Sequence, residues 1–547
     1  MTMVAEPLRN GRFADLVLRN VTVWTVDGHR PRAEAVAIKG NEIVAAGRNE
    51  EVASLIGKGT RVHDLQGRLV LPGFNDSHTH FVLETLVAAT AFSLYRIDSL
   101  QEVQRRLQAN ALAHPDSEWL YGSRWSNHLF AGKWPTRSVL DAVEARRPVA
   151  IFDIDWHTAW VNTAALQRLG YDASTRDPDG GTIVRDDAGM PTGILFENAH
   201  ASIPSIPRPA DKVYAEWLSK EVESLNRLGI TSISNMESRL DNVELTARLA
   251  GAGRLNLRIN HWPELPKGLE HARQAQSSCR GSEQIRIVGL KAFMDGVLSN
   301  RTAWLLEPYS DAAGTCGYPV SNVEELAQRV LEADAAGFQV VIHAIGDRAV
   351  RETLDLYERA GRVNGKRDSR HRIEHAELIH PADVARFAAL GVIPSMTPVH
   401  LCAPSVGEYL HAGVGSLRGE HAFTWRALVD AGANLCFGTD WAAIELERPN
   451  PLEQIFAAVT RIPPQEPDGG PLLNPEQCLS VEQAIRSYTL ESAYAEFMEP
   501  RKGSITPGKL ADLCVLSKNI LDTDPGQILE TEVVMTVFDG RVVYERL

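Results

Sequence analysis

The sequence predicts an α/β fold: a (β/α)8 TIM barrel, a small β-sandwich domain built from both termini, and a long insertion after barrel strand 1. Three observations support this. Eight short apolar strands alternate with helical patterns through the middle of the chain. Both ends alternate apolar and polar residues. The interval between the first two barrel strands is too long for one crossover connection. The chain has 547 residues, which favours a large domain with an accessory one.

The two ends of the chain are predicted to form one sheet domain. Near the start, "ADLVLRNVTVWTVDG" and "AEAVAIKGNEIVAAG" alternate in polarity and are punctuated by turn dipeptides. "ADLCVLSKNI" and "VVMTVFDGRVVYER" show the same pattern near the finish. We therefore expect residues 1–70 and 500–547 to form a composite β-sandwich, and the alternative is two separate edge hairpins.

The middle of the chain, residues 71–499, is predicted to be the barrel. Its strands are "RLVLPGF", "ITSISNM", "LNLRIN", "RIVGLKAFMD", "FQVVIHAIG", "HRIEHAEL", "VIPSMTP" and "NLCFGTDW". An open doubly wound sheet is the alternative, but eight strands over this length favour closure. We expect residues of about 87–228 to form an inserted subdomain that covers the barrel mouth.

Composition argues against several classes of partner. The formal net charge of −14 disfavours nucleic acid and anionic membranes as partners. Six scattered cysteines without a C-x-x-C motif argue against a cysteine zinc site and a dense disulfide framework. The first residues contain no apolar signal region, so we expect a cytoplasmic protein. The sequence leaves the oligomeric state open, with a homodimer as one common outcome.

Two histidines in "LPGFNDSHTHF" raise the possibility of a metal site. His78 and His80 are two residues apart, so a strand would direct both imidazoles to the same face. Alone, the pair is weak evidence, because polar residues in a turn give the same pattern.

Other ionisable residues stand at the carboxyl ends of the predicted strands, where barrel active sites form. These are Lys291, His343, His375 and Asp440. Each has a structural explanation by itself: a buried histidine, a helix cap or a buried ion pair. Together with His78 and His80 they would be costly to bury without a compensating metal.

The order "HTH", lysine, "IHAIGD", "EH", "TDW" resembles the amidohydrolase superfamily, and more narrowly the amidohydrolase-3 branch with its N-substituted formamide deformylases. The resemblance covers nearly the whole chain. It includes the insertion motif "RPVAIFDIDWHTAWVNTAAL", "PTGILFENA", "GLKAFMDGVLSNRTA" and the closing "GSITPGKLADLCVL".

The resemblance implies two divalent metal ions, with Zn2+ the expected metal. His78, His80 and Asp440 would hold the first, His343 and His375 the second, and a carboxylated Lys291 would bridge them. Imidazole and carboxylate ligands suit zinc. Burial lowers a lysine pKa and so supplies the neutral amine that reacts with carbon dioxide. If Lys291 stays unmodified, the alternative is a mononuclear site.

The implied activity is hydrolysis of a C–N bond in a small-molecule amide, with N-substituted formamides as one candidate class. Asp440 would act as general base and then general acid. His157 in "DWHTAWVN" corresponds to a branch-specific histidine that would contact substrate or act as a second electrophile. Its alternative role is a structural hydrogen bond within the insertion.

Tryptophans beside these positions are candidates for an apolar substrate pocket. Trp304 and Trp441 are the predicted contacts, and Trp156 and Trp160 are further candidates. Thr397 in "SMTPVH" stands where many relatives carry glutamine, so no substrate contact is predicted from strand 7.

Other functions remain open on the same residues. Ester, lactone or phosphotriester hydrolysis uses the same kind of barrel and metal pair. Deamination is disfavoured by Lys291, because deaminating relatives generally hold one metal without a lysine bridge. A catalytically inactive scaffold is disfavoured because this chain keeps all six of the implied ligands.

Overall fold

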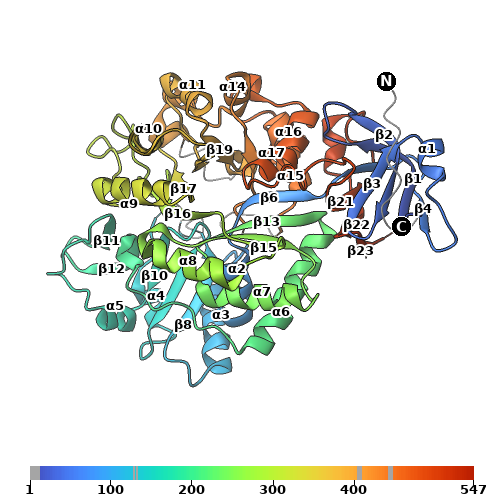
Figure 1. The fold of residues 1–547 in the computed structure, drawn as a ribbon. Coiled ribbons are helices and arrows are strands. Elements are labelled where there is room, and N and C mark those ends of the chain that lie inside the picture. Colours follow the sequence, from blue (N-terminus) through green and yellow to red (C-terminus); the bar gives the residue numbers. More distant parts are fainter. Residues whose placement is uncertain (1–12, 127–129, 131–132, 403–409, 442–447, 547) are drawn as a thin grey trace.

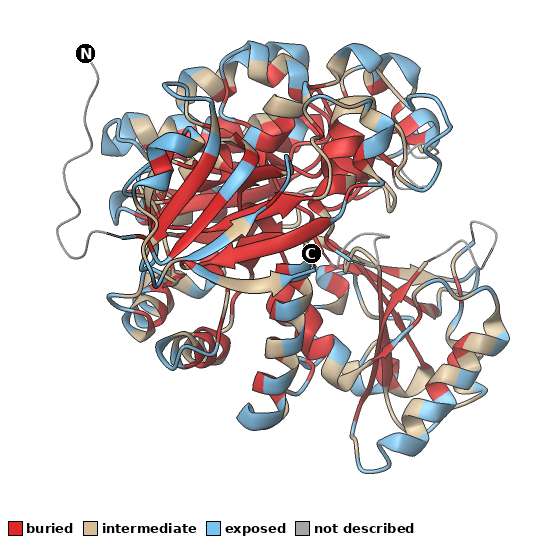
Figure 2. Ribbon diagram, turned by 90° about the vertical axis from the view of Figure 1, so that its right-hand side faces the viewer, coloured by how far each residue is buried: buried red, intermediate tan, exposed pale blue. Residues whose placement is uncertain are grey.

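The structure is a computed structural model that describes residues 13–126, 130, 133–402, 410–441 and 448–546. It contains a barrel, a sheet made by both ends of the chain and an inserted sheet beside the barrel (Figure 1). Buried residues concentrate on the strands, whereas the outer faces of the helices are exposed (Figure 2).

The barrel is a closed ring of parallel strands. Its strands are β6 (Phe74–Thr79), β13 (Ile230–Met236), β14 (Arg258–Trp262), β16 (Gly289–Phe293), β17 (Gln339–Ala344), β18 (Arg372–His375), β19 (Ile393–Met396) and β20 (Cys436–Phe437). They form two arcs, β15-β14-β13-β6 and β16-β17-β18-β19-β20, where β15 is Ile285–Arg286. Bridges between Glu264 and Lys291 and between Thr79 and Trp441 join the arcs. The predicted barrel is confirmed, and the open sheet is excluded.

Helices cover the outside of the barrel. They include α2 (Phe81–Thr90), α6 (Asp211–Arg227), α7 (Leu240–Gly251), α8 (Gly268–Ser278), α9 (Val323–Ala335), α10 (Asp347–Asn364), α11 (Pro381–Leu390), α14 (Trp425–Asp430), α15 (Pro451–Thr460), α16 (Val481–Ser487) and α17 (Leu490–Tyr494). In α10, Val350, Leu354 and Tyr357 are buried at helical spacing, so one stripe of the helix faces the strands. The spacing of apolar residues, three or four positions apart, therefore fixes which face of each helix is buried.

Both ends of the chain contribute to one eight-stranded sheet. Its strands are β1 (Leu16–Trp24), β2 (Arg32–Lys39), β3 (Glu42–Gly47), β4 (Arg61–Asp64), β5 (Leu69–Pro72), β21 (Leu513–Leu516), β22 (Val533–Phe538) and β23 (Arg541–Glu545). β5 joins the two ends, because it pairs with β1 on one side and with β21 on the other. This pairing excludes two separate hairpins. The two-layer sandwich and the domain limits 1–70, 500–547 and 71–499 stay predictions.

One predicted strand is divided between two sheets. "RLVLPGF" was expected to be the first barrel strand, but its apolar part is β5 in the terminal sheet. The barrel strand begins only at Phe74 and carries His78. Gly73 separates them at a close approach, where an added Cβ would lie 2.3 Å from Thr231 Oγ1. The chain can change sheets there because glycine leaves room for the neighbouring strand.

The insertion forms a separate sheet inside the predicted interval 87–228. Its strands are β7 (Phe92–Ser93), β8 (Leu120–Trp125), β9 (Val149–Asp153), β10 (Thr158–Val161), β11 (Gly181–Arg185) and β12 (Pro191–Glu197), with helices α3 (Leu100–Ala113), α4 (Arg137–Asp141) and α5 (Thr163–Leu169). The end of the interval is α6, which packs against α2 and leads into β13.

Two further observations concern the cysteines and the helices. All six cysteines are free thiols, in keeping with the absence of a predicted disulfide framework. Within the described residues, every helix is too short or too polar to cross a membrane.

A buried ion pair ties the terminal sheet to the barrel. Arg258 of β14 donates from Nε to Asp512 Oδ2 at 2.6 Å and from Nη2 to Asp539 Oδ1 at 2.9 Å. Asp512→Ala should destabilise the protein by about 3 kcal/mol, the low end for breaking a buried pair because Asp539 remains. The measurement is the urea midpoint followed by tryptophan fluorescence.

The matched control is Asp187→Ala, an exposed aspartate in the turn between β11 and β12. It should change the free energy of unfolding by less than about 0.5 kcal/mol. Equal midpoints for the two variants would contradict the importance of this contact.

Candidate functional site

A cavity of about 560 Å³ lies at the carboxyl ends of the barrel strands. The barrel lines it with His78, His80, Lys291, His343, His375, His400 and Asp440, among others. The insertion adds Asp155, Trp156, His157, Glu197 and His200. Its volume is within the range of small-molecule sites.

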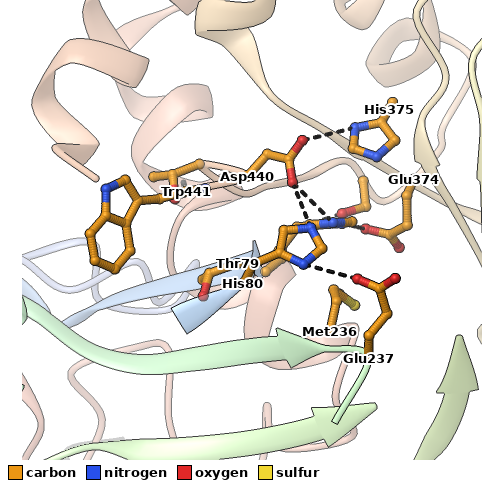
Figure 3. Close-up of polar contacts among 12 residues, drawn as sticks. Thr79, His80, Met236, Glu237, Glu374, His375, Asp440 and Trp441 are labelled. Carbon is orange, nitrogen blue, oxygen red and sulfur yellow. Dashed lines mark hydrogen bonds and ion pairs between the residues drawn. The ribbon is translucent and has the colours of Figure 1, made fainter. Parts of the chain in front are cut away.

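Asp440 is the centre of the cluster at the base of this cavity (Figure 3). Its Oδ1 lies 3.3 Å from His78 Nε2 and 3.2 Å from His80 Nε2. Its Oδ2 lies 3.3 Å from His400 Nε2 and 3.8 Å from His375 Nδ1. Each carboxylate oxygen therefore faces one pair of histidines. The ligand atoms of each pair and of Asp440 lie within 4.8 Å of one another.

His78 is held in place by a buried ion pair. Its Nδ1 contacts Glu374 Oε2, and Arg372 Nε donates to Glu374 Oε1 at 2.8 Å. Arg372 Nη2 also donates to the Ser77 carbonyl oxygen at 2.6 Å, which connects β18 to β6. Because Nδ1 is occupied, Nε2 of His78 is left to face Asp440.

His80 and His400 have the same arrangement. His80 Nδ1 lies 3.0 Å from Glu237 Oε2, as Figure 3 shows, and His400 Nδ1 lies 2.9 Å from Glu377 Oε1. Carboxylate partners of this kind fix the ring orientation of metal-binding histidines and raise their basicity. Three of the four histidines around Asp440 are thus oriented by a glutamate.

The electrostatics of the cluster keep its carboxylates ionised. Burial raises the pKa of Glu374, but the charges of Arg372 and His78 outweigh this and bring it to about 2. Burial likewise opposes ionisation of Asp440, yet the adjacent His78 and His375 hold its pKa well below its usual range. Asp440 is therefore an anion at neutral pH.

Several buried polar atoms in the cluster make no hydrogen bond. Among the described residues these include His78 Nε2, His375 Nδ1, His400 Nε2 and Asp440 Oδ1. A buried polar atom left without a partner costs about 1–3 kcal/mol. Here such atoms converge on one carboxylate, and they are the nitrogen and oxygen donors that zinc prefers. The residues present fit a divalent cation.

The other two predicted ligands line the same cavity. Lys291 is buried on β16, where its Nζ lies 4.7 Å from the centroid of the Phe293 ring, and burial lowers its pKa. His343 is the penultimate residue of β17, its ring lies 4.6 Å from that of His375, and its Nε2 faces the Gly296 carbonyl oxygen at 3.2 Å. The six predicted residues are brought together, while carboxylation of Lys291 stays a prediction.

His157 enters the cavity from the insertion. Its Nδ1 lies 2.8 Å from Glu197 Oε2, and Thr302 donates to Glu197 Oε1 at 2.7 Å. Burial lowers the pKa of His157, but Glu197 more than compensates and raises it to about 9. The ring centroid lies 5.1 Å from that of His343, so this imidazole stands next to the cluster around Asp440.

The predicted tryptophan contacts need correction. Neither Trp304 nor Trp441 is among the described residues that line the cavity. Figure 3 shows the Trp441 indole directed away from the histidines, and its main-chain oxygen accepts from His80 N at 2.7 Å. The main chain of Trp441 thus joins the two arcs of the barrel. Trp156 does line the cavity and stacks on Phe152, with ring centroids 4.7 Å apart.

Sequence reasoning missed His400 and the orienting glutamates. The signal for His400 was present in "SMTPVH", where the histidine follows a predicted strand as His78 and His80 do. Glu374 stands directly before His375 in the "EH" motif, and Glu197 lies within "PTGILFENA". Their pairing depends on contacts between strands that lie far apart in the sequence.

The comparison with known families decides the classification. A model described as "Amidohydrolase family" matches residues 61–544. The chain belongs to the amidohydrolase family. This agrees with the resemblance found in the sequence motifs.

Relatives match this amidohydrolase over almost its whole length. Protein LONG AFTER FAR-RED 3 of Arabidopsis thaliana is 31% identical, over 98% of this chain and 92% of its own. N-substituted formamide deformylase of Arthrobacter pascens is 29% identical, over 98% of this chain and 99% of its own. An uncharacterized metal-dependent hydrolase from Pyrococcus horikoshii has a similar structure, with a TM-score of 0.73 and 26% sequence identity. The match covers 93% of this chain and 99% of the Pyrococcus chain.

The pair of Glu237 and His80 gives a test of metal binding. Glu237→Gln should lower the affinity for a divalent ion by about 10–100-fold, because the imidazole loses its orienting carboxylate. The measurement is competition with a chromophoric chelator for Zn2+ or Co2+. Glu216→Gln, at an exposed position on α6, is the matched control and should leave the affinity unchanged. Equal affinities in the two variants would contradict the orienting role.

Proposed function

We propose that this chain is a metal-dependent hydrolase that cleaves the C–N bond of small linear amides, with N-substituted formamides as the first candidate class. The observation that carries the proposal is the convergence of unpaired histidine nitrogens on Asp440 beneath a small-molecule cavity. The amidohydrolase relatives support the same reaction class, and one of them is named for deformylation.

In this proposal His78, His80 and Asp440 hold one divalent ion, expected to be zinc. His343 and His375 contribute to a second position, and His375 lies close to Asp440. A divalent cation supplies Lewis acidity, which polarises a carbonyl oxygen and lowers the pKa of water. Lys291 belongs to the same proposal: its neutral amine adds carbon dioxide, releases a proton and becomes an anionic carbamate.

Asp440 moves the proton. Its carboxylate is ionised, so it can accept a proton from the attacking water. It then returns that proton to the leaving nitrogen as the C–N bond breaks, which releases a neutral amine and a carboxylic acid. Asp440 has a φ of +54°, a left-handed conformation for a non-glycine residue, as is common at functional sites.

His157 stabilises the substrate oxygen. Because Glu197 occupies Nδ1, the protonated ring has only its Nε2–H left to donate into the cavity. A positioned donor aimed at a developing oxyanion contributes about 10²–10³ in rate.

The apolar part of the cavity lining favours an apolar substituent on the amide. Trp156, Phe293, Leu298 and Ile345 are among the lining residues. Apolar walls with few polar groups are typical of sites that bind small organic ligands. Ester or lactone hydrolysis is the alternative chemistry on the same residues, while a homodimeric assembly and a cytoplasmic location stay predictions.

The first test is formate release from a panel of N-substituted formamides. Purified protein should produce formate, lose the activity after chelation and regain it with added Zn2+, because the proposed reaction needs a bound cation. Asp440→Asn should lower kcat by at least about 10²-fold through loss of the proton acceptor.

His114→Asn is the matched control, since His114 is an exposed residue after α3. It should behave as the wild type. Metal-loaded protein that releases neither formate nor a larger acid from any amide would contradict the proposal and direct the search to esters and lactones.

The raised pKa of His157 predicts a pH dependence. The cationic form persists up to about pH 9, so kcat/KM should fall as pH rises through that value. His157→Asn should lower kcat/KM about 10²-fold and abolish this descending limb. If kcat/KM of the variant still falls near pH 9, the titrating group is a residue other than His157.

A further inference from the structure

His400 enters the cavity from η4 (Pro398–Cys402), the short helix that follows β19. It is not one of the six ligands implied by the family resemblance. Its Nδ1 is occupied by Glu377, whereas its Nε2 is buried, makes no hydrogen bond and lies 3.3 Å from Asp440 Oδ2. The free nitrogen therefore points into the metal cluster.

The two oxygens of Asp440 have matching surroundings. Oδ1 faces His78 and His80, and Oδ2 faces His375 and His400. The rings of His375 and His400 are nearly parallel, with an interplanar angle of 13° and centroids 5.5 Å apart. Two histidine pairs thus share one bridging carboxylate.

His343 is oriented by a main-chain carbonyl instead of a glutamate, which is also usual for metal-binding histidines. Its Nε2 faces the Gly296 carbonyl oxygen at 3.2 Å, which is the contact of a ring N–H donor. Its ring lies 4.6 Å from that of His375, and among the described residues no ion pair joins it to Asp440. His400 reaches the shared carboxylate directly.

We propose that His400, oriented by Glu377, is a ligand of the second divalent ion, together with His375 and Asp440. This assignment would add strand 7 to the second position, with Asp440 shared between the two positions. This assignment rests on the metal dependence of the proposed function. It gives strand 7, which lacked a predicted contact, a direct role in the metal centre.

The experiment measures metal stoichiometry and affinity without substrate. Wild type, His400→Asn and the control His114→Asn are titrated with Zn2+ against a chelator, and bound metal is counted by elemental analysis. His400→Asn should fall from about two ions per chain to about one, and its first-ion affinity should stay as in the control. In Co2+-loaded protein, the visible absorption of the second ion should disappear.

Glu377→Gln is a milder variant in case His400→Asn fails to fold. It keeps the size of the side chain and should weaken the second ion about 10–100-fold while the first is unchanged. Retention of both ions at control affinity in His400→Asn, or in Glu377→Gln if only that variant folds, would overturn the proposal. A wild-type protein that binds only one ion would overturn it as well.

The outcome is independent of the amide assay. If wild type binds two ions, loses one in His400→Asn and hydrolyses no amide, the proposed function fails and the ligand assignment stands. If formamides are hydrolysed while His400→Asn keeps both ions, the assignment to His400 fails alone.

Discussion

The pairing of four cavity histidines with glutamates is the interaction on which the site depends. Glu374, Glu237, Glu377 and Glu197 each take the Nδ1 atom of one histidine. The opposite nitrogen of each ring is then free for chemistry. A cluster of imidazoles around a carboxylate would otherwise be costly to bury, and carboxylate partners lower this cost by supplying charge and hydrogen bonds. The glutamates also prevent the rings from turning away from Asp440.

The closed barrel supplies these partners from different strands. His78 on β6 meets Glu374 on β18, and Arg372 on β18 donates to a carbonyl of β6, so the pair spans the interior. The main chain at the strand ends is also unusual. Glu237, His375 and Asp440 all have positive φ values. Such conformations cost of order 1–3 kcal/mol each and persist where the surroundings hold them, which is typical of functional sites.

Much of this architecture could be predicted because the spacing of apolar and polar residues indicates which face of a strand or helix is buried. "ITSISNM" coincides with β13, and the six expected cavity residues come together because parallel strands end on one face. The pattern does not say which sheet a strand joins, so "RLVLPGF" was assigned to the barrel although β5 pairs with β21. His400 was missed because one histidine after a strand is commonplace. The indole of Trp441 lies outside the cavity lining because adjacency in sequence to Asp440 does not fix side-chain direction.

The terminal sheet cannot be completed until the last part of the chain has been synthesised. β5 needs β21 as its neighbour, but their partners Pro72 and Leu513 are 441 residues apart. At ribosomal rates of about 5–20 residues per second, β21 is synthesised roughly 20–90 s after β5. During this time the nascent chain carries an apolar strand with an unpaired edge, a known hazard for aggregation. Production of the protein should therefore respond to elongation speed and to chaperones that shield exposed strands.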